Sequence, residues 1–270
     1  MLVLKTKVKN TNLLTISVLI LIFSLASSCG VKKGAIQIDD GSLNTILKKI
    51  ELFEGALRSL KGLAKVKIKT PDSKISYTQV TIAERPDLLR LEALNPFGKT
   101  VGFISSDGTN IYIISPSERG VYDSSTNFDL AYVYPGLNLK ITAINLVNLI
   151  LGRLPDKVYD LGSKPEMSAD GSQIKLNFAS DNSSEPNTLW VNSTNYRVEK
   201  AEFSVDQGSR AVITYEYFDS LIDGFYFPKT IDFASKGLSI TIFYDPDVEL
   251  NKNVDKALYR PAAETVKFEN

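Results

Sequence analysis

Residues 42–62 carry apolar side chains at helical spacing. After Ser42, whose side-chain oxygen can cap a helix, apolar residues recur three or four positions apart at Leu43, Ile46, Leu47, Ile50, Phe53, Leu57 and Leu60. A helix presents such positions on one face and leaves its other face to polar residues. We therefore predict an amphipathic helix that begins at Ser42 and ends near Gly62.

The pattern then changes to a period of two. Within 64–69, Ala64, Val66 and Ile68 alternate with three lysines, as expected of a strand with one buried and one solvent-exposed face. Similar short segments, separated by turns, predict further strands at 75–84, 88–94, 100–106, 110–115, 120–124, 173–179, 188–192, 197–205, 211–218, 229–234 and 238–244. Short strands at this spacing are typical of antiparallel sheets.

A second helix interrupts the series of strands. Its apolar residues are Ile141, Ile144, Leu146, Val147, Leu149, Ile150 and Leu151, and Gly152 and Pro155 follow as stop signals. A large antiparallel sheet must have its apolar face covered, and two helices can cover it. We therefore predict a mainly β fold with about a dozen antiparallel strands and helices over a strongly curved sheet.

The first 29 residues have the features of an export signal. A basic start with three lysines precedes an apolar run, 13–25, that is shorter than the ~20 residues of a membrane-spanning helix. Residues 25–29, ending at Cys29, resemble the lipobox of bacterial lipoproteins, which implies cleavage before Cys29 and its acylation. Gly30, where an inner-membrane signal would have Asp, favours the outer membrane by the same resemblance. An ordinary cleaved signal and an uncleaved anchor are the alternatives.

The organisation of the chain follows from these segments. We expect a lipoprotein signal peptide over 1–28 and a flexible tether over 29–41, because 30–41 has few residues that could pack. No linker or change of composition divides the remainder, so 42–270 is predicted to be a single domain.

Charge and composition argue against several classes of function. The chain has 31 Lys and Arg and 31 Asp and Glu, so it lacks the basic excess of nucleic-acid-binding proteins. It has no histidine, the commonest general base and metal ligand, and only one cysteine. We therefore expect no enzyme, no cofactor, no metal site and no nucleic-acid partner.

Two phrases of the sequence carry a resemblance to a known family. Residues 85–100, RPDLLRLEALNPFGKT, resemble the "PDRYRL…NPLG" segment of the LolB family of outer-membrane lipoproteins. Residues 145–155 resemble that family's helix ending in "ILGLP", and 227–231 are similar to a later strand entry. This resemblance implies an unclosed antiparallel β-barrel with a helical lid over an apolar cavity, which would hold the acyl chains of a client.

The same resemblance suggests two sites. The turn Asn95, Pro96, Phe97 and Gly98 would be a membrane-insertion loop with Phe97 at its tip, where the family has Leu. A hairpin whose Phe97 folds back on the core is the alternative. The expected cavity-lining residues, each of which could also be ordinary core, are Leu89, Leu91, Ile111, Ile113, Leu146, Ile150, Trp190, Ile231 and Phe233.

Three functions compete. The resemblance implies a monomer anchored in the outer membrane by its N-terminal lipid and facing the periplasm. It would receive client lipoproteins from a LolA-like periplasmic carrier, bind their acyl chains and help to insert them. The alternatives are a lipid-anchored structural or interaction module of the envelope with a filled interior, and a binder of another amphiphile.

Overall fold

The computed structural model describes residues 40–116, 119–130, 140–155, 158, 164–180, 183–205 and 209–261. The predicted signal peptide and Cys29 lie outside these ranges, as does all of the predicted tether except Asp40 and Gly41. Among the helices of the described residues, none combines the length and the apolar character that crossing a bilayer would require.

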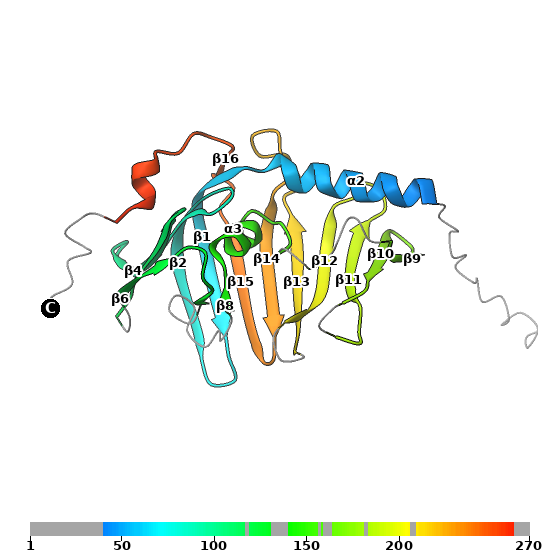
Figure 1. The fold of residues 1–270 in the computed structure, drawn as a ribbon. Helices are drawn as coiled ribbons and strands as arrows, with labels where there is room; N and C mark the ends of the chain where they lie inside the picture. The colour runs from blue at the N-terminus through cyan, green and yellow to red at the C-terminus, as the bar shows by residue number, and fades with distance from the viewer. Residues whose placement is uncertain are drawn as a thin grey trace, which may run out of the picture. The chain divides into compact units, whose positions relative to one another are not determined.

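One large open sheet dominates the fold (Figure 1). Its strands lie in the order β6-β5-β4-β3-β2-β1-β15-β14-β13-β12-β11-β10-β9, with β16 paired to β1 to make 14 strands. Their bounds are β1 Ser59–Lys69, β2 Lys74–Glu84, β3 Leu88–Leu94, β4 Thr100–Asp107, β5 Asn110–Ile114, β6 Arg119–Asp123, β9 Glu166–Asp170, β10 Gln173–Phe178, β11 Asn187–Asn192, β12 Val198–Val205, β13 Ser209–Tyr217, β14 Pro228–Ser235, β15 Leu238–Tyr244 and β16 Glu249–Leu250. The order begins at β6 and ends at β9, so the sheet does not close.

The sheet consists of two meanders joined at one seam. Within β1–β6 and within β9–β15, each strand pairs antiparallel with its neighbour in the sequence. The seam is the antiparallel pair β1–β15, in which Val66 lies opposite Ile242. Local hairpins therefore build each half, and one long-range pairing joins the halves into a single sheet.

The predicted mainly β, unclosed antiparallel fold is confirmed. The alternation in β1 gives buried Ala64, Val66 and Ile68 between exposed lysines. β3 and β15 have the bounds that the pattern predicted. The short strands β9 and β16, and a separate two-stranded sheet of β7 (Phe128–Asp129) and β8 (Lys140–Ile141), were not predicted.

The first helix differs from its prediction at both ends. α2 spans Asp40–Ala56, and Leu60 and Gly62 belong to β1 instead. Asn251 explains the end of the helix, because its side chain accepts from the Arg58 backbone N–H at 2.7 Å and donates to the Ala56 carbonyl at 2.9 Å. Gly62 is a close-approach glycine rather than a helix stop, since a Cβ there would lie 2.6 Å from Val248 Cγ1.

The second helix, α3 (Ala143–Ile150), lies within the predicted 141–151. Thr142 caps it, with its hydroxyl oxygen accepting from the Asn145 N–H at 3.2 Å. At its other end, Tyr244 donates its hydroxyl hydrogen to the Ile150 carbonyl at 3.1 Å. α3 is thus fixed against β15 near the seam.

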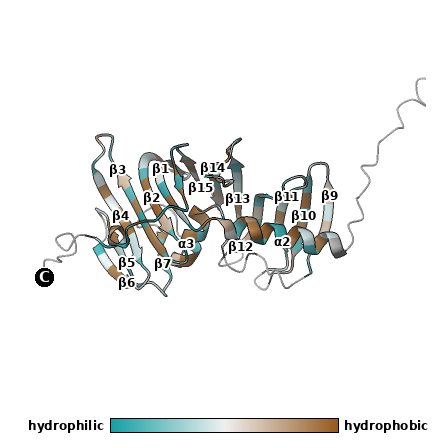
Figure 2. Ribbon diagram, turned by 90° about the horizontal axis from the view of Figure 1, so that it is seen from above, coloured by the Kyte–Doolittle hydropathy of each residue, from teal (hydrophilic) through white to brown (hydrophobic). Residues whose placement is uncertain are grey.

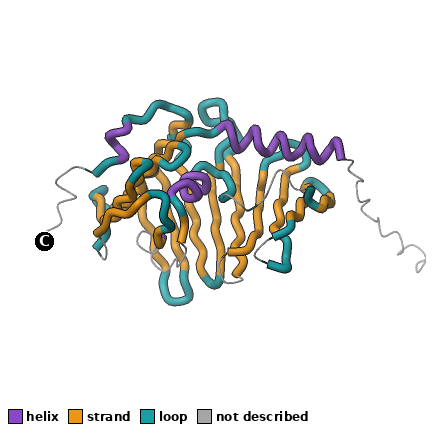
Figure 3. The backbone as a smooth tube through the Cα atoms, viewed as in Figure 1, coloured by secondary structure: helices purple, strands orange, loops and turns teal. Residues whose placement is uncertain are grey.

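Both helices lie on the same side of the curved sheet, α3 over the β1–β3 half and α2 along β10–β14 (Figures 1 and 3). Viewed from above, the sheet curves around them (Figure 2). The apolar faces of both helices join the strands in one core cluster, which includes Leu43, Ile50, Leu146 and Ile150. The helices therefore fill the inner side of the sheet.

The C-terminal segment covers the opposite face of β2–β4. It contains a short 3-10 helix, η4 (Lys256–Tyr259), in which the Tyr259 side chain is fully buried. The Ser105 hydroxyl donates to the Tyr259 carbonyl, and Arg90 Nη1 donates to the Leu258 carbonyl at 3.0 Å. This half of the sheet is therefore covered on both faces.

Candidate functional site

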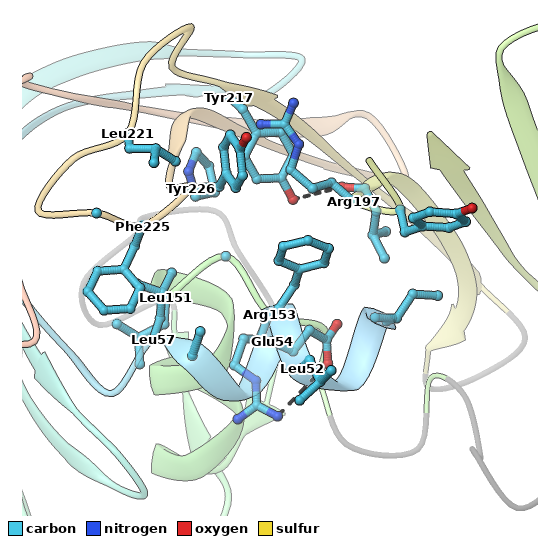
Figure 4. A pocket seen from close by; sticks show the side chains of 18 residues that line it. Leu52, Glu54, Leu57, Leu151, Arg153, Arg197, Tyr217, Leu221, Phe225 and Tyr226 are labelled. Atoms are coloured by element: carbon cyan, nitrogen blue, oxygen red, sulfur yellow. Dashed lines mark hydrogen bonds and ion pairs between the residues drawn. The ribbon is translucent and has the colours of Figure 1, made fainter. Parts of the chain in front are cut away.

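A pocket of about 360 Å³ lies between α2 and the β12–β14 part of the sheet (Figure 4). Four segments distant in sequence line it: the end of α2, the turn after α3, the start of β12, and the stretch from the end of β13 to the start of β14. The lining residues are Ile50, Leu52, Phe53, Glu54, Ala56, Leu57, Leu151, Gly152, Arg153, Tyr196, Arg197, Val198, Tyr217, Leu221, Gly224, Phe225, Tyr226 and Pro228.

The lining is mainly apolar. Ile50, Leu57 and Leu151 are buried at its inner side, whereas Leu52 is 63% exposed and Leu221 is 50% exposed. Large apolar side chains that remain half in water at a pocket are typical of a surface that binds something apolar. The pocket therefore suits an apolar molecule or an apolar part of one.

Gly152 brings the turn after α3 against the sheet. Its φ is +72°, in the left-handed region that favours glycine. A Cβ at this position would lie 2.5 Å from Pro228 Cγ. Tyr215 of β13 donates its hydroxyl hydrogen to the next carbonyl, that of Arg153, at 3.1 Å. The turn that carries Leu151 and Arg153 into the pocket is thus fixed from two sides.

Arg197 lies between two tyrosine rings. Its guanidinium carbon is 4.6 Å from the ring centroid of Tyr217 and 4.3 Å from that of Tyr226. Its Nε and Nη1 are buried, and neither has a hydrogen-bond acceptor among the described residues. Contact with the two rings helps to hold the guanidinium, but it does not satisfy the N–H groups at the edge of its plane.

The second arginine of the pocket faces α2. Arg153 Nη2 lies 3.9 Å from Glu54 Oε2, and Arg153 Nη1 donates to Asn148 Oδ1 at 3.4 Å. Burial, with the negative charge of Glu54 as the next cause, raises the pKa of the Tyr217 hydroxyl, and the positive Arg197 partly opposes this rise. Tyr217 is therefore neutral at physiological pH, and its hydroxyl donates to the Val198 carbonyl at 2.9 Å.

The predicted loop forms a tight turn with an exposed tip. Asn95 Oδ1 accepts from the backbone N–H groups of Phe97 at 2.9 Å and Lys99 at 3.0 Å, and Gly98 has a φ of +76°. Phe97 is 88% exposed. The alternative in which Phe97 folds back on the core is wrong, because Asn95 closes the turn with the ring pointing outward. The loop's action at a membrane stays a prediction.

The nine predicted cavity-lining residues lie elsewhere than the pocket. Seven are buried in the core cluster: Leu89, Leu91, Ile111, Ile113, Leu146, Ile150 and Ile231. Phe233 is half-buried and packs against that cluster. Trp190 alternates with buried Leu189 and Val191, and Lys200 lies 4.2 Å from its ring centroid. None of the nine belongs to the pocket lining, and their contact with an acyl chain stays a prediction.

The sequence analysis missed most of the pocket. The lining residues that it had named, such as Ile50, Leu57 and Leu151, had been assigned to the two helices and not to a pocket. Arg197 and Tyr226 carry no local signal, because a single arginine or tyrosine beside a turn is common in any sheet. Within the described parts of the chain, no cluster of three or more His, Cys, Asp or Glu side chains could hold a metal ion.

Solved structures with a similar fold support the architecture. A LolA superfamily protein from Nitrosomonas europaea superposes with a TM-score of 0.53 at 18% identity, covering 80% of this chain and 96% of that one. The two share a fold. A DUF1329 family protein from Desulfovibrio piger gives a TM-score of 0.52 at 10% identity, covering 83% of this chain and 97% of that chain.

At these identities the likeness concerns the fold alone. No known protein-family profile matches the sequence, and no curated protein matches it either. The superpositions on solved structures confirm the LolA-like fold that the resemblance implied. Its finer implications, the membrane loop and the acyl-chain cavity, remain proposals.

Proposed function

We propose that this chain is a lipid-anchored protein of the bacterial envelope that binds acyl chains and acts in lipoprotein sorting. The observation that carries the proposal is the mainly apolar pocket of about 360 Å³ between α2 and the sheet of a LolA-like fold. Its volume lies near the lower end of the ~300–1,000 Å³ common for small-molecule sites, which suits one chain rather than several.

The energetics of such a protein need no catalytic group. Each CH₂ kept from water is worth about 0.8 kcal/mol, so exposing a long acyl chain would cost on the order of 10 kcal/mol. Passing the chain from one apolar cavity to a similar one is then nearly isoenergetic. A transfer of this kind is consistent with a chain that has no histidine and a single cysteine.

The finer proposal is a role like that of LolB. The acylated Cys29 would anchor the protein in the outer membrane, facing the periplasm, and a LolA-like carrier would deliver client lipoproteins to it. The exposed Phe97 tip would then enter the bilayer while the client's chains leave the protein. Burying one aromatic side chain gives roughly 1.5–3 kcal/mol, enough to orient a protein that is already anchored.

A second candidate is a lipid-anchored structural or interaction module of the envelope. The dense packing of the predicted cavity wall favours it, since Leu91, Ile111 and Ile113 have no exposed surface. Under this proposal the pocket would be a feature of the surface without a lipid ligand.

Photolabelling tests acyl-chain binding. The full chain, in phosphatidylcholine nanodiscs, is exposed to a triacylated lipopeptide with a photoreactive group in one chain, and the labelled peptides are mapped. We expect labels on α2 and the β13–β14 loop. Leu52→Glu, at the pocket, should reduce labelling at least about tenfold, because it places a charge beside the apolar chain.

Leu258→Glu is the matched control, because Leu258 is also an exposed leucine, at 40%, and lies outside the pocket lining. It should leave the labelling unchanged. Labelling spread evenly over the surface, or equal loss in both variants, would favour the interaction module.

A further inference from the structure

We infer that the pocket binds an amphiphile whose apolar chain ends in an anionic oxygen group, a carboxylate or a phosphate, which Arg197 recognises. This inference rests on the proposed acyl-chain binding and adds the chemical class of the ligand. A ligand made of neutral apolar chains alone would leave the positive charge of Arg197 without an anionic partner.

The charges around the pocket do not cancel. Its charged lining residues are Glu54, Arg153 and Arg197. Glu54 lies 3.9 Å from Arg153, so these two opposite charges face each other. Arg197 forms no ion pair with any carboxylate of the described chain, which leaves one positive charge in excess at a mainly apolar site.

The nearest acidic residue in the sequence is engaged elsewhere. Glu199 accepts from Gln173 Nε2 at 2.6 Å through one oxygen and from Asn192 Nδ2 at 2.8 Å through the other. Both oxygens thus accept hydrogen bonds from β10 and from the end of β11, and Glu199 forms no ion pair with Arg197 among the described residues. The guanidinium contacts the rings of Tyr217 and Tyr226, which stabilise its charge.

Such an arginine is well suited to bind an anion. A cation in an apolar setting is costly unless it is paired, and buried Nε and Nη1 without acceptors add to that cost. The two rings fix the guanidinium plane, so little conformational entropy is lost when a planar partner binds at its edge. Carboxylate and phosphate oxygens match this geometry and form charge-assisted hydrogen bonds.

The arrangement of the pocket provides for both parts of the ligand. Arg197 and its tyrosines occupy one side, and the apolar Leu57, Leu151 and Phe225 occupy another (Figure 4). A chain lying along these apolar side chains would bring an anionic end group to Arg197. A fatty acid and a phospholipid both have this chemistry.

A matched pair of probes tests the inference. The full chain in phosphatidylcholine nanodiscs is photolabelled with a photoreactive hexadecanoic acid or with the corresponding hexadecanol at pH 8. We expect the acid to label pocket peptides at least about tenfold more than the alcohol, since a hydrogen bond to a charged group is worth about this factor. Arg197→Gln should bring the ratio close to one, with alcohol labelling unchanged.

Arg119→Gln, at an exposed arginine of β6, is the control and should keep the wild-type ratio. Should Arg197→Gln fail to fold, the ratio measured with wild-type protein still decides. Equal labelling by acid and alcohol, together with labelling by the triacylated lipopeptide, would overturn this inference and leave acyl-chain binding intact. Failure of all three probes to label the pocket would overturn both.

Competition identifies the source of the anionic group. Unlabelled hexadecanoate and phosphatidic acid, each added at the same mole fraction, compete with the photoreactive acid. Stronger competition by the first indicates a carboxylate ligand, and stronger competition by the second a phosphate ligand. Diacylglycerol competing as well as either would contradict recognition of the charge.

Discussion

At the scale of single residues, polar side chains that accept hydrogen bonds within a turn determine which apolar side chain lies exposed at its tip. Asn95 accepts from two backbone N–H groups of its own turn, and these bonds hold the backbone of Phe97 at the tip. An aromatic ring that is 88% exposed gains nothing from water, which is why we assign it a contact with another phase.

Phe97→Glu tests this assignment. Because the ring makes no buried contact, the melting temperature should stay within about 1 °C of the wild type. Delivery of a lipoprotein into liposomes should fall several-fold, since a charge resists entry into the bilayer. Phe97→Leu, which keeps an apolar tip, should retain activity. Full activity of the glutamate variant, or a melting temperature lowered as for a core substitution, would exclude the membrane role.

At the scale of elements, α3 serves as packing rather than as a removable cover. Its inner residues Leu146, Val147 and Ile150 are buried in the core, and Thr142 and Tyr244 fix its two ends. α2 is different, because Leu52 and Phe53 near its end remain partly exposed at the pocket. Any movement that widens the pocket is therefore expected in α2.

Leu146→Glu tests whether α3 is part of the packed core or a removable cover. An unpaired charge in the core should lower the free energy of unfolding by more than about 3 kcal/mol, as followed by urea titration. Ile144→Glu, on the 40% exposed side of the same helix, should change it by less than about 0.5 kcal/mol. A stable Leu146→Glu protein that has lost only lipid binding would instead show that α3 is a mobile lid.

At the scale of the whole molecule, the folded domain and the proposed lipid anchor belong to different parts of the chain. The described residues fold as one large sheet, a separate two-stranded sheet and helices that share one core, and Cys29 lies outside them. Two or more acyl chains hold a protein stably at a membrane, whereas one chain holds it only marginally.

Cys29→Ala should therefore leave the domain folded and remove its lipid anchor. The measurement is fractionation of envelope membranes combined with circular dichroism of the purified variant. We expect an unchanged spectrum and loss of the protein from the outer-membrane fraction. If the variant still fractionates with the outer membrane as the wild type does, the lipobox interpretation is wrong.

The sequence by itself determined most of the strands, the helix α3 and the exposed loop. Alternation in β1 and β10 and turn residues such as Asn95 and Gly98 act over a few neighbouring positions, so their effect can be predicted without the rest of the chain. The antiparallel sheet followed from the same local pattern, whereas its unclosed form was expected only from the family resemblance. The alternation also indicated that one face of the sheet would be apolar. It did not indicate which apolar residues would fill the core.

Only the tertiary structure decided where α2 ends and where the pocket lies. Asn251 ends the helix and Val248 requires Gly62, although both lie almost two hundred residues away in sequence, because the pairing of β16 with β1 brings them beside the start of β1. The pocket likewise needs four distant segments, and Arg197 became notable only when its two tyrosines and its missing acceptors were seen together. Such features depend on long-range register and on what each side chain meets across space, which no local pattern records.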